Sequence, residues 1–235
     1  VYEMKVLLTA TVQSHICQFH RPLVKMLHEL GYEVHIAARN NLAEKNGLRL
    51  DFADKVFDVP FSRSPKSTDN IEAYRQIRKI IAKGNYDIIH CNTPMGGVVT
   101  RLACKGLRKK GVRVFYTAHG FHFYKGAPLK NWLLYYPAEK FCAHFTDTLI
   151  TINREDYALA ERKMKAKKVV YVPGVGIDVN KFRNTKIDRA AKREELGIPE
   201  DAFLLLSVGE LNENKNHQIV IRALAELNDP SIHYT

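Results

Sequence analysis

The stretch Val112-Arg113-Val114-Phe115-Tyr116-Thr117-Ala118-His119-Gly120-Phe121-His122-Phe123 is rich in β-branched and aromatic residues and ends at a polar turn that contains a glycine. These features predict a buried strand with two histidines, His119 and His122, at its carboxyl end. In open α/β sheets, ligands bind in the crevice beyond the carboxyl ends of the strands. His119 is therefore a candidate functional residue, and the alternative is an ordinary loop histidine whose hydrogen bonds are satisfied.

Strand-like and helix-like segments alternate on both sides of this stretch. Apolar and β-branched runs predict six further strands, at residues 5–10, 33–38, 55–59, 86–91, 147–152 and 168–172. Apolar residues at helical spacing predict a helix with Phe19, Leu23, Met26, Leu27 and Leu30 on its buried face, and further helices near 71–84, 94–107, 132–145 and 154–165. This alternation predicts an α/β fold with a doubly wound, parallel, Rossmann-like sheet in an N-terminal domain of residues 1–173.

The pattern changes at Pro173-Gly174-Val175-Gly176, which begins a stretch of polar residues. Residues 174–200 are predicted to cross between domains, and residues 201–235 to begin a second Rossmann-like domain with one strand at 202–209 and one helix at 218–227. One strand and one helix cannot bury both faces of a sheet. We therefore expect the second domain to be truncated, disordered, or completed by residues outside this chain.

Charge composition points to an anionic partner. The 36 Lys and Arg residues exceed the 25 Asp and Glu residues, which gives a net charge of +11. No tract interleaves aromatic with basic residues as single-strand binders do, so we expect no nucleic acid and favour a phosphorylated small molecule or an acidic membrane surface. The basic segments 130–140 and 154–168 are the candidates for membrane docking, with solvated helix faces as the alternative.

Cysteine spacing and hydropathy indicate where the protein works. The four cysteines contain no C-x-x-C pair, so neither a zinc site nor a disulfide framework is expected. The apolar run after Met4 is too short for a signal peptide, and no run approaches the roughly 20 apolar residues of a membrane span. We expect a cytoplasmic protein, either soluble or peripheral on the inner face of the cell membrane.

Five ordered landmarks carry a resemblance to a known family. They are 5–8 (KVLL), 87–94 (DIIHCNTP), 117–120 (TAHG), 172–178 (VPGVGID) with Phe182, and 207–217 (SVGELNENKNH). In this order they resemble the family 4 glycosyltransferases, most of all the bacterial capsule and exopolysaccharide members. The resemblance implies a two-domain GT-B fold, a nucleotide-sugar donor held mostly by the second domain, and an acceptor, often a lipid-linked saccharide, held by the first. It also implies retention of anomeric configuration without a metal or other cofactor.

The resemblance also suggests residue roles. Lys215 would neutralise the departing diphosphate, and His119 would hydrogen-bond a sugar hydroxyl or orient the reacting pair. Further donor-binding candidates are Gly174, Gly176, Gly209, Glu210 and Asn214, and acceptor-binding candidates are Gln13, Ser14, His15, Asn92, Thr93, Phe121 and His122. Family members commonly carry an arginine on the loop before the lysine, whereas this chain has Glu210 after Gly209, so a second cationic contact is in question.

Two other functions are open at this level. A sugar-nucleotide epimerase shares the GT-B architecture, although the loop from Gly209 to Lys215 resembles the transferases. The second alternative is a non-catalytic basic α/β module that binds a phosphorylated lipid or partner.

No Asp-x-Asp pair follows a strand, which agrees with a metal-free hexosyltransferase. The paired-glutamate motif of the family would fall beyond Thr235, so we expect the 235 residues alone to be inactive. Finally, we expect His15, Asn92 and His119 to share one rim of the sheet.

Overall fold

The computed structural model describes residues 4–45, 47–213 and 215–235, and for Lys181 only the backbone. Asn214, a predicted donor-binding residue, lies outside the described residues. The chain divides into two compact units, of which the first ends at Gly176 and the second runs from Ile177 to Thr235.

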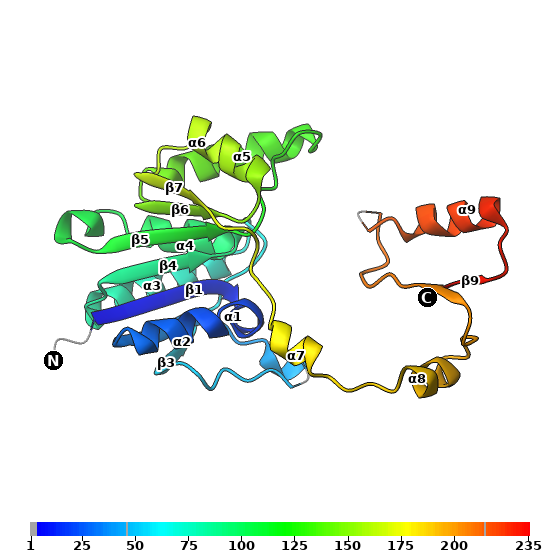
Figure 1. The fold of residues 1–235 in the computed structure, drawn as a ribbon. Coiled ribbons are helices and arrows are strands. Elements are labelled where there is room, and N and C mark those ends of the chain that lie inside the picture. The colour runs from blue at the N-terminus through cyan, green and yellow to red at the C-terminus, as the bar shows by residue number, and fades with distance from the viewer. Residues whose placement is uncertain (1–3, 46, 214) are drawn as a thin grey trace. The chain divides into compact units, whose positions relative to one another are not determined.

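The first unit contains a seven-stranded parallel sheet in the order β3-β2-β1-β4-β5-β6-β7 (Figure 1). Its strands are β1 (Met4–Val12), β2 (Tyr32–Arg39), β3 (Lys55–Asp58), β4 (Ile88–Asn92), β5 (Arg113–Ala118), β6 (Thr148–Thr151) and β7 (Lys168–Tyr171). The chain builds outward from β1 in one direction and then returns to β4 and builds outward in the other. The α/β, doubly wound fold predicted from the sequence is therefore confirmed, and its topological switch point lies between β1 and β4.

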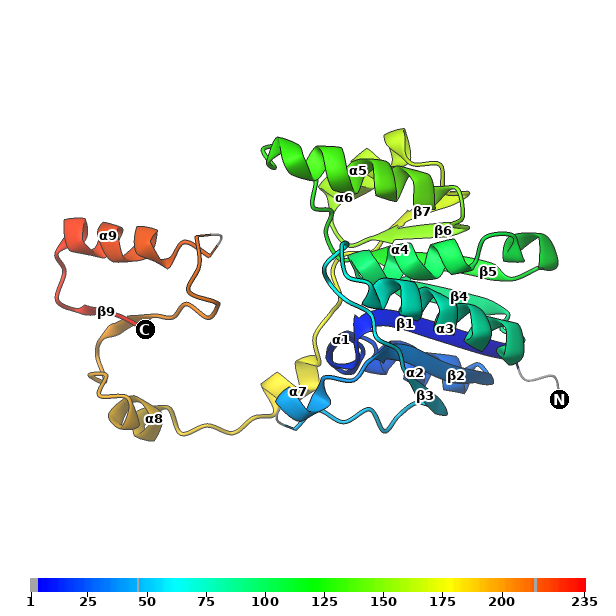
Figure 2. The same cartoon turned by 180° about the vertical axis from the view of Figure 1, so that it is seen from behind.

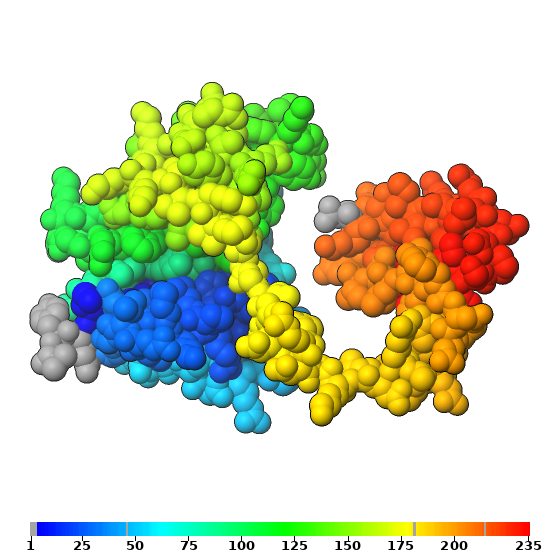
Figure 3. Space-filling view, viewed as in Figure 1, coloured from blue at the N-terminus to red at the C-terminus, as the bar shows by residue number. Residues whose placement is uncertain are grey.

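Helices cover both faces of this sheet. They are α1 (Gln13–Phe19), α2 (Arg21–Glu29), α3 (Asp69–Gly84), α4 (Pro94–Ala103), α5 (Leu129–Ala143) and α6 (Arg154–Lys163), with the short 3-10 helices η1 (Leu42–Glu44) and η2 (Leu107–Lys110). The α1–α2 side faces the viewer in Figure 1, and α3 and α4 lie in front in Figure 2. Figure 3 shows that the side chains of α1 and α2 fill the spaces left between the ribbons.

Alternation along β1 explains the two layers of core. Val6 and Leu8 point to one face and pack with Val24 and Leu27 of α2, whereas Leu7 points to the other face and packs with Ile77 of α3. Successive side chains of a strand point to opposite faces, so a strand covered on both sides is apolar throughout. The continuous apolar run of β1 therefore suits its place in the centre of the sheet.

The helix predicted across residues 19–30 is two helices that meet at His20. Pro22 lies at the start of α2, where its missing N–H is not needed, and the break before it turns His20 toward the sheet. The predicted buried face was wrong for Phe19, Met26 and Leu30, which are exposed. The strand predicted at residues 5–10 is longer than expected, because β1 continues to Val12, and α1 begins directly after it at Gln13.

The second unit contains one βα unit followed by a strand that the sequence prediction missed. Strands β8 (Phe203–Leu205) and β9 (Ile232–Tyr234) pair in parallel, and helix α9 (His217–Leu227) connects them. Helices α7 (Val179–Arg183) and α8 (Arg189–Glu195) precede β8 in the chain. The strand expected at 202–209 is shorter, because β8 ends at Leu205, and after one further backbone hydrogen bond from Ser207 to Thr235 the chain enters the loop to α9.

Candidate functional site

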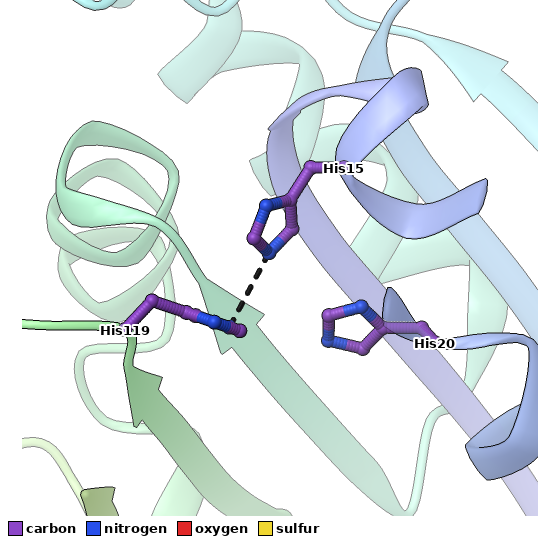
Figure 4. A group of neighbouring side chains, drawn as sticks. All are labelled: His15, His20 and His119. Carbon is purple, nitrogen blue, oxygen red and sulfur yellow. Dashed lines mark hydrogen bonds between the residues drawn. The ribbon is translucent and has the colours of Figure 1, made fainter. Parts of the chain in front are cut away.

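Three histidines from separate segments meet at the carboxyl end of the sheet (Figure 4). His15 comes from α1, His20 from the junction of α1 and α2, and His119 from the turn after β5. Nε2 of His15 lies 3.3 Å from Nε2 of His119, and one ring nitrogen of each histidine lies within 4.8 Å of those of the other two. We call His15, His20 and His119 the histidine cluster.

Asn92 fixes the floor of the histidine cluster. It ends β4 at the switch point and is fully buried. Its Oδ1 lies 2.8 Å from Nε2 of His20 and 3.4 Å from Nε2 of His119. The expectation that His15, Asn92 and His119 share one rim is therefore confirmed, and the rim is the one at which an open α/β sheet binds ligands.

Burial makes these imidazoles hard to protonate. Burial, followed by the nearby His119, lowers the pKa of His15 to about 3, and burial with the nearby His20 lowers the pKa of His119 to about 4. The pKa of His20 is also lowered by burial, against a hydrogen bond from its ring to Oδ1 of Asn92 that raises it. All three rings are neutral near pH 7, so each can accept a hydrogen bond or offer a lone pair.

A cavity of about 420 Å³ opens beside the cluster. Four of the predicted acceptor-binding residues line it: Ser14, His15, Thr93 and His122. Arg63 and Tyr135, which the sequence analysis did not select, line it as well. A guanidinium, an imidazole and several hydroxyl groups facing one cavity can bind a polyhydroxylated or anionic group.

A smaller and more apolar cavity of about 200 Å³ adjoins it. The two cavities share His122, Tyr135, Pro94 and Met95 as lining residues. The predicted residue Phe121 lines only the smaller cavity, where its ring stacks on Phe123 at 4.7 Å between centroids. The rim thus offers a polar space and an apolar space side by side.

The backbone at the start of α4 is held in an unusual conformation. Thr93 has φ +63° and ψ 152°, a combination that a β-branched residue adopts only at a cost. Its hydroxyl lies 2.7 Å from that of Thr11 and also accepts the Thr11 N–H at 2.9 Å. A Cβ on Gly96 would approach the backbone of Ala10 and Thr11 to 3.0 Å, so this helix begins unusually close to β1.

Gln13 and Asn92 support the rim and do not line either cavity. Gln13 is buried and its Nε2 donates to the carbonyl of Ala38 at 3.4 Å. Since a buried amide needs partners, both side chains brace neighbouring strands and loops. Their predicted role as acceptor contacts stays a prediction, and the geometry places them behind the residues that face the cavity.

A buried ion pair lies under the smaller cavity. Nη2 of Arg101 in α4 contacts Oε2 of Glu139 in α5 at 2.8 Å, and the Tyr116 hydroxyl donates to Oε1 of Glu139 at 3.1 Å. The Arg101 guanidinium carbon also lies 3.7 Å from the centroid of the Tyr116 ring. This network ties β5, α4 and α5 together directly beneath the rim.

The predicted donor-side residues lie on loops. Gly174 and Gly176 follow β7 with φ of +79° and +75°, which glycine adopts without strain. In the second unit, the N–H of Lys215 donates to Oδ1 of Asn212 at 3.0 Å, and Asn212 donates to Glu210 at 2.9 Å.

The Gly209 loop closes tightly on Lys215. The Cγ of Lys215 lies 3.3 Å from where a Cβ on Gly209 would stand, so a larger residue at position 209 would displace the lysine stem. Lys215 itself is exposed, two residues before α9 begins, as an anion-binding lysine near a helix N-terminus should be.

Sequence reasoning missed His20, Arg63 and Tyr135. His20 lay inside what read as a continuous amphipathic helix, and its one signal was the proline two residues later. Arg63 belongs to the irregular segment after β3, and Tyr135 reads as one more aromatic residue of a long helix. Neither pattern distinguishes a residue that faces a cavity from one that faces solvent.

Solved structures with the same fold identify the class of protein. HepE from Anabaena, in complex with UDP and glucose, superposes with a TM-score of 0.68 at 16% identity and covers 99% of this chain and 60% of its own. UDP-GlcNAc 2-epimerase from Neisseria meningitidis, bound to UDP-GlcNAc, superposes at 0.64 and 14% identity over 98% of this chain and 65% of its own. At these identities the likeness shows the fold, which is of the GT-B class that transferases and epimerases share.

Sequence comparison identifies the family. A family model described as glycosyl transferase 4-like matches residues 5–153. The chain belongs to this glycosyltransferase family, as the sequence analysis predicted.

Two curated relatives are similar over most of the chain. EpsD of Bacillus subtilis (strain 168), whose name gives glycosyltransferase as its inferred activity, is 44% identical over 227 residues, which is 96% of this chain and 58% of EpsD. The UDP-Gal:alpha-D-GlcNAc-diphosphoundecaprenol alpha-1,3-galactosyltransferase of Escherichia coli is 28% identical over 184 residues, which is 75% of this chain and 46% of that enzyme. The chain thus spans about half the length of these relatives.

Proposed function

We propose that the protein is a retaining hexosyltransferase that moves a sugar from a nucleotide diphosphate to a lipid-linked saccharide in polysaccharide biosynthesis. The observation that carries the proposal is the histidine cluster beside a polar cavity at the switch point of a family 4 fold. A neutral His119 at this position can hydrogen-bond a hydroxyl of the transferred sugar while the acceptor occupies the cavity.

The acceptor class follows from the two adjoining cavities. Arg63, His15 and His122 suit a saccharide or its phosphate, and the apolar cavity beside them suits a hydrocarbon or acetyl group. The galactosyltransferase relative names a diphosphoundecaprenol-linked sugar as its acceptor, which supports the same chemistry for this chain.

The donor side is proposed to rest on Lys215. Loss of the nucleotide diphosphate develops negative charge on the leaving group, and a cation at a helix start can stabilise it. In this proposal no divalent metal is required for transfer, and Gly209 and Glu210 on the same loop bind the donor together with Lys215.

The proposed reaction takes place at an anionic membrane surface on the inner face of the cell membrane. No helix in the described ranges is long and apolar enough to cross a membrane. Helix α5 exposes Leu129 and Leu133, at 73% and 71%, and carries the exposed lysines Lys130 and Lys140. Exposed leucines between lysines suit insertion among lipid headgroups. Helix α6 has Glu155 and Glu161 among its exposed residues, so α5 is the stronger docking candidate.

A transfer assay tests the proposal. A chain of the relatives' length, supplied with UDP-, GDP- or TDP-sugars and a diphosphoprenyl-linked saccharide, should extend the acceptor with the anomeric configuration of the donor, and EDTA should not reduce the rate. Proton NMR of the product reads the configuration directly. An acceptor-independent change in the donor sugar itself would replace the transferase with an epimerase, and donor binding without any product would favour the non-catalytic module.

A further inference from the structure

The spacing within the histidine cluster matches a metal's coordination sphere better than a hydrogen-bonded pair. Zinc binds histidine nitrogen at about 2.0–2.1 Å, so two ligands of a tetrahedral zinc lie about 3.3 Å apart. Nε2 of His15 and Nε2 of His119 are 3.3 Å apart, beyond the common range of about 2.7–3.2 Å for protein hydrogen bonds from N–H donors. A ring nitrogen of His20 lies within 4.8 Å of those of both, which is close enough for the three side chains to be grouped around one ion.

Unsatisfied polarity is a second, independent sign of a ligand. Nδ1 of His20 is buried and makes no hydrogen bond to any residue that the structure describes, although the His20 ring lies near enough to the backbone of His15 for that backbone to raise its pKa. Buried polar atoms are almost always paired, so one left over beside two other imidazoles needs an explanation. A bound cation would engage the cluster that this ring belongs to.

We propose that His15, His20 and His119 form a binding site for a divalent transition-metal ion, with zinc as the natural occupant. Three histidines are a known zinc ligand set that leaves one coordination position open, and imidazole favours zinc, copper, nickel and iron over magnesium or calcium. The open position faces the cavity of about 420 Å³ that His15 lines, so water or a ligand oxygen can fill it.

Asn92 supplies a hydrogen-bond acceptor of the kind that usually orients a metal-binding histidine from behind. Its Oδ1 contacts Nε2 of His20 at 2.8 Å and Nε2 of His119 at 3.4 Å. By accepting a hydrogen bond from Nε2–H of His20, Oδ1 orients that ring as outer-sphere partners of zinc ligands do, and this leaves Nδ1 of His20 to bind the ion. Beside Nε2 of His119, which would itself bind the ion, Oδ1 can serve as an oxygen ligand. Because Asn92 is fully buried at the end of β4, its oxygen is held in place.

The site reaches beyond the proposed function and does not depend on it. An ion on Nε2 of His119 would take the lone pair that the proposed transfer directs at the sugar. This one consequence rests on the proposed function: metal-bound and substrate-bound forms then exclude each other, so zinc inhibits transfer.

Metal titration tests the inference. The untagged 235-residue chain is stripped with a chelator and titrated with Co²⁺, read by visible absorption, and with Zn²⁺, read by calorimetry. We expect one equivalent of each ion and a tetrahedral Co²⁺ spectrum. His15→Ala and His20→Ala should each weaken binding by more than the roughly 10–100-fold that loss of an outer-sphere partner causes.

The controls separate the site from surface histidines and from misfolding. His144→Ala removes an exposed histidine at the end of α5 and should leave the affinity unchanged. His20 is buried, so its variant is compared by circular dichroism, and the half-buried His15→Gln repeats the test with less structural risk. No tetrahedral Co²⁺ spectrum, or a folded His15 variant that binds as tightly as the parent, would overturn the site. Neither result touches the transfer assay, which is run in EDTA.

Discussion

Protonating His90 costs the folded protein more than protonating an exposed histidine, because the ring has no access to water. It lies on β4 with Nε2 2.8 Å from the Thr117 hydroxyl, and burial lowers its pKa to about 3. His15 and His119 behave alike, with pKa values of about 3 and 4. In the unfolded chain all three titrate near 6.5. As pH falls below 6.5, the unfolded state therefore binds protons first and gains stability relative to the fold.

The first prediction is a loss of stability between about pH 6.5 and pH 3, with full stability above the pH at which the unfolded histidines titrate. From pH 6.5 to 5.5, His90 alone should lower the free energy of unfolding by about 1 kcal/mol. His90→Asn, which keeps a polar group for Thr117, should remove that increment from the pH slope. Urea unfolding at both pH values, followed by the fluorescence of Trp132 in the first unit, measures it.

His28→Asn is the matched control for this pH experiment. His28 is exposed and its Nε2 lies 2.9 Å from Oδ2 of Asp54, so this variant removes a histidine that is not buried and should leave the increment from His90 in place. If His90→Asn kept the parent's pH slope while unfolding cooperatively, the proposed exclusion of charge from this position would be wrong.

For individual residues, the sequence could predict a place on the rim only for side chains that directly follow a predicted strand. His119 and Asn92 follow directly from strand ends, and both are where we expected. His20 could not be placed, because its position depends on a helix break that local periodicity does not reveal. Arg63 and Tyr135 depend on how a loop and a helix pack across the sheet, which is tertiary information.

Among the elements, α4 and α5 depend most on one interaction between side chains. Arg101 is fully buried, and its charge is balanced by Glu139, whose side chain is also almost inaccessible. Removing one partner of a buried pair leaves the other charge without compensation.

The second prediction is that Glu139→Ala lowers the free energy of unfolding of the first unit by about 3–5 kcal/mol. The double variant Arg101→Met with Glu139→Leu should recover much of the loss, because two apolar residues leave no buried charge. Glu195→Ala, which opens the exposed pair with Lys192, should change stability by less than about 1 kcal/mol. A single and a double variant of equal stability would show that the lost stability is packing and not charge.

The outer side of α5 is exposed and is the surface that the proposed function assigns to membrane docking. Leu129 and Leu133 lie one helical turn apart, expose most of their surface, and have Lys130 beside them. A folded protein gains nothing by exposing two leucines one turn apart, and an interface with lipid would bury them.

The third prediction is that the protein binds vesicles that contain anionic lipid and that binding falls as salt rises. Leu129→Ser with Leu133→Ser should reduce co-sedimentation with such vesicles by about tenfold, since each buried leucine contributes on the order of 1 kcal/mol or more. Ile71→Ser, an exposed apolar residue on α3, is the control and should not change it. Binding that ignores both lipid charge and salt would count against docking through this helix.

The strands of the first unit could be predicted well because buried parallel strands are short apolar runs between polar turns. The split between α1 and α2 could not, since Phe19, Leu23 and Leu27 fit one helical face with or without the break at His20. Strand β9 was missed because Ile232-His233-Tyr234 is only three residues long and its one partner, β8, is distant in sequence. Short pairings between distant segments leave little local signal.

At the scale of the whole molecule, the proposed function assigns the sugar to neutral side chains of the first unit and the charged diphosphate to a lysine of the second unit. The first unit holds neutral histidines beside the cavity that is proposed to bind the saccharide, and the second holds the cationic Lys215 on a loop that begins at Gly209. A neutral hydrogen-bonding group suits a sugar, whereas a lysine suits a diphosphate. Removing each should therefore change different measured quantities.

The last prediction is that His119→Ala and Lys215→Ala differ in nucleotide binding. In a chain of the relatives' length, assayed in EDTA, Lys215→Ala should lower turnover by ~100-fold or more, because a positioned partner of the developing charge is lost. It should also weaken the affinity for the nucleoside diphosphate. His119→Ala should lower turnover while leaving that affinity nearly unchanged, since His119 is proposed to contact sugar and not diphosphate. Lys186→Ala, an exposed lysine of the same unit, should change neither quantity. Calorimetry beside turnover would refute the division if His119→Ala lost nucleotide affinity as severely as Lys215→Ala.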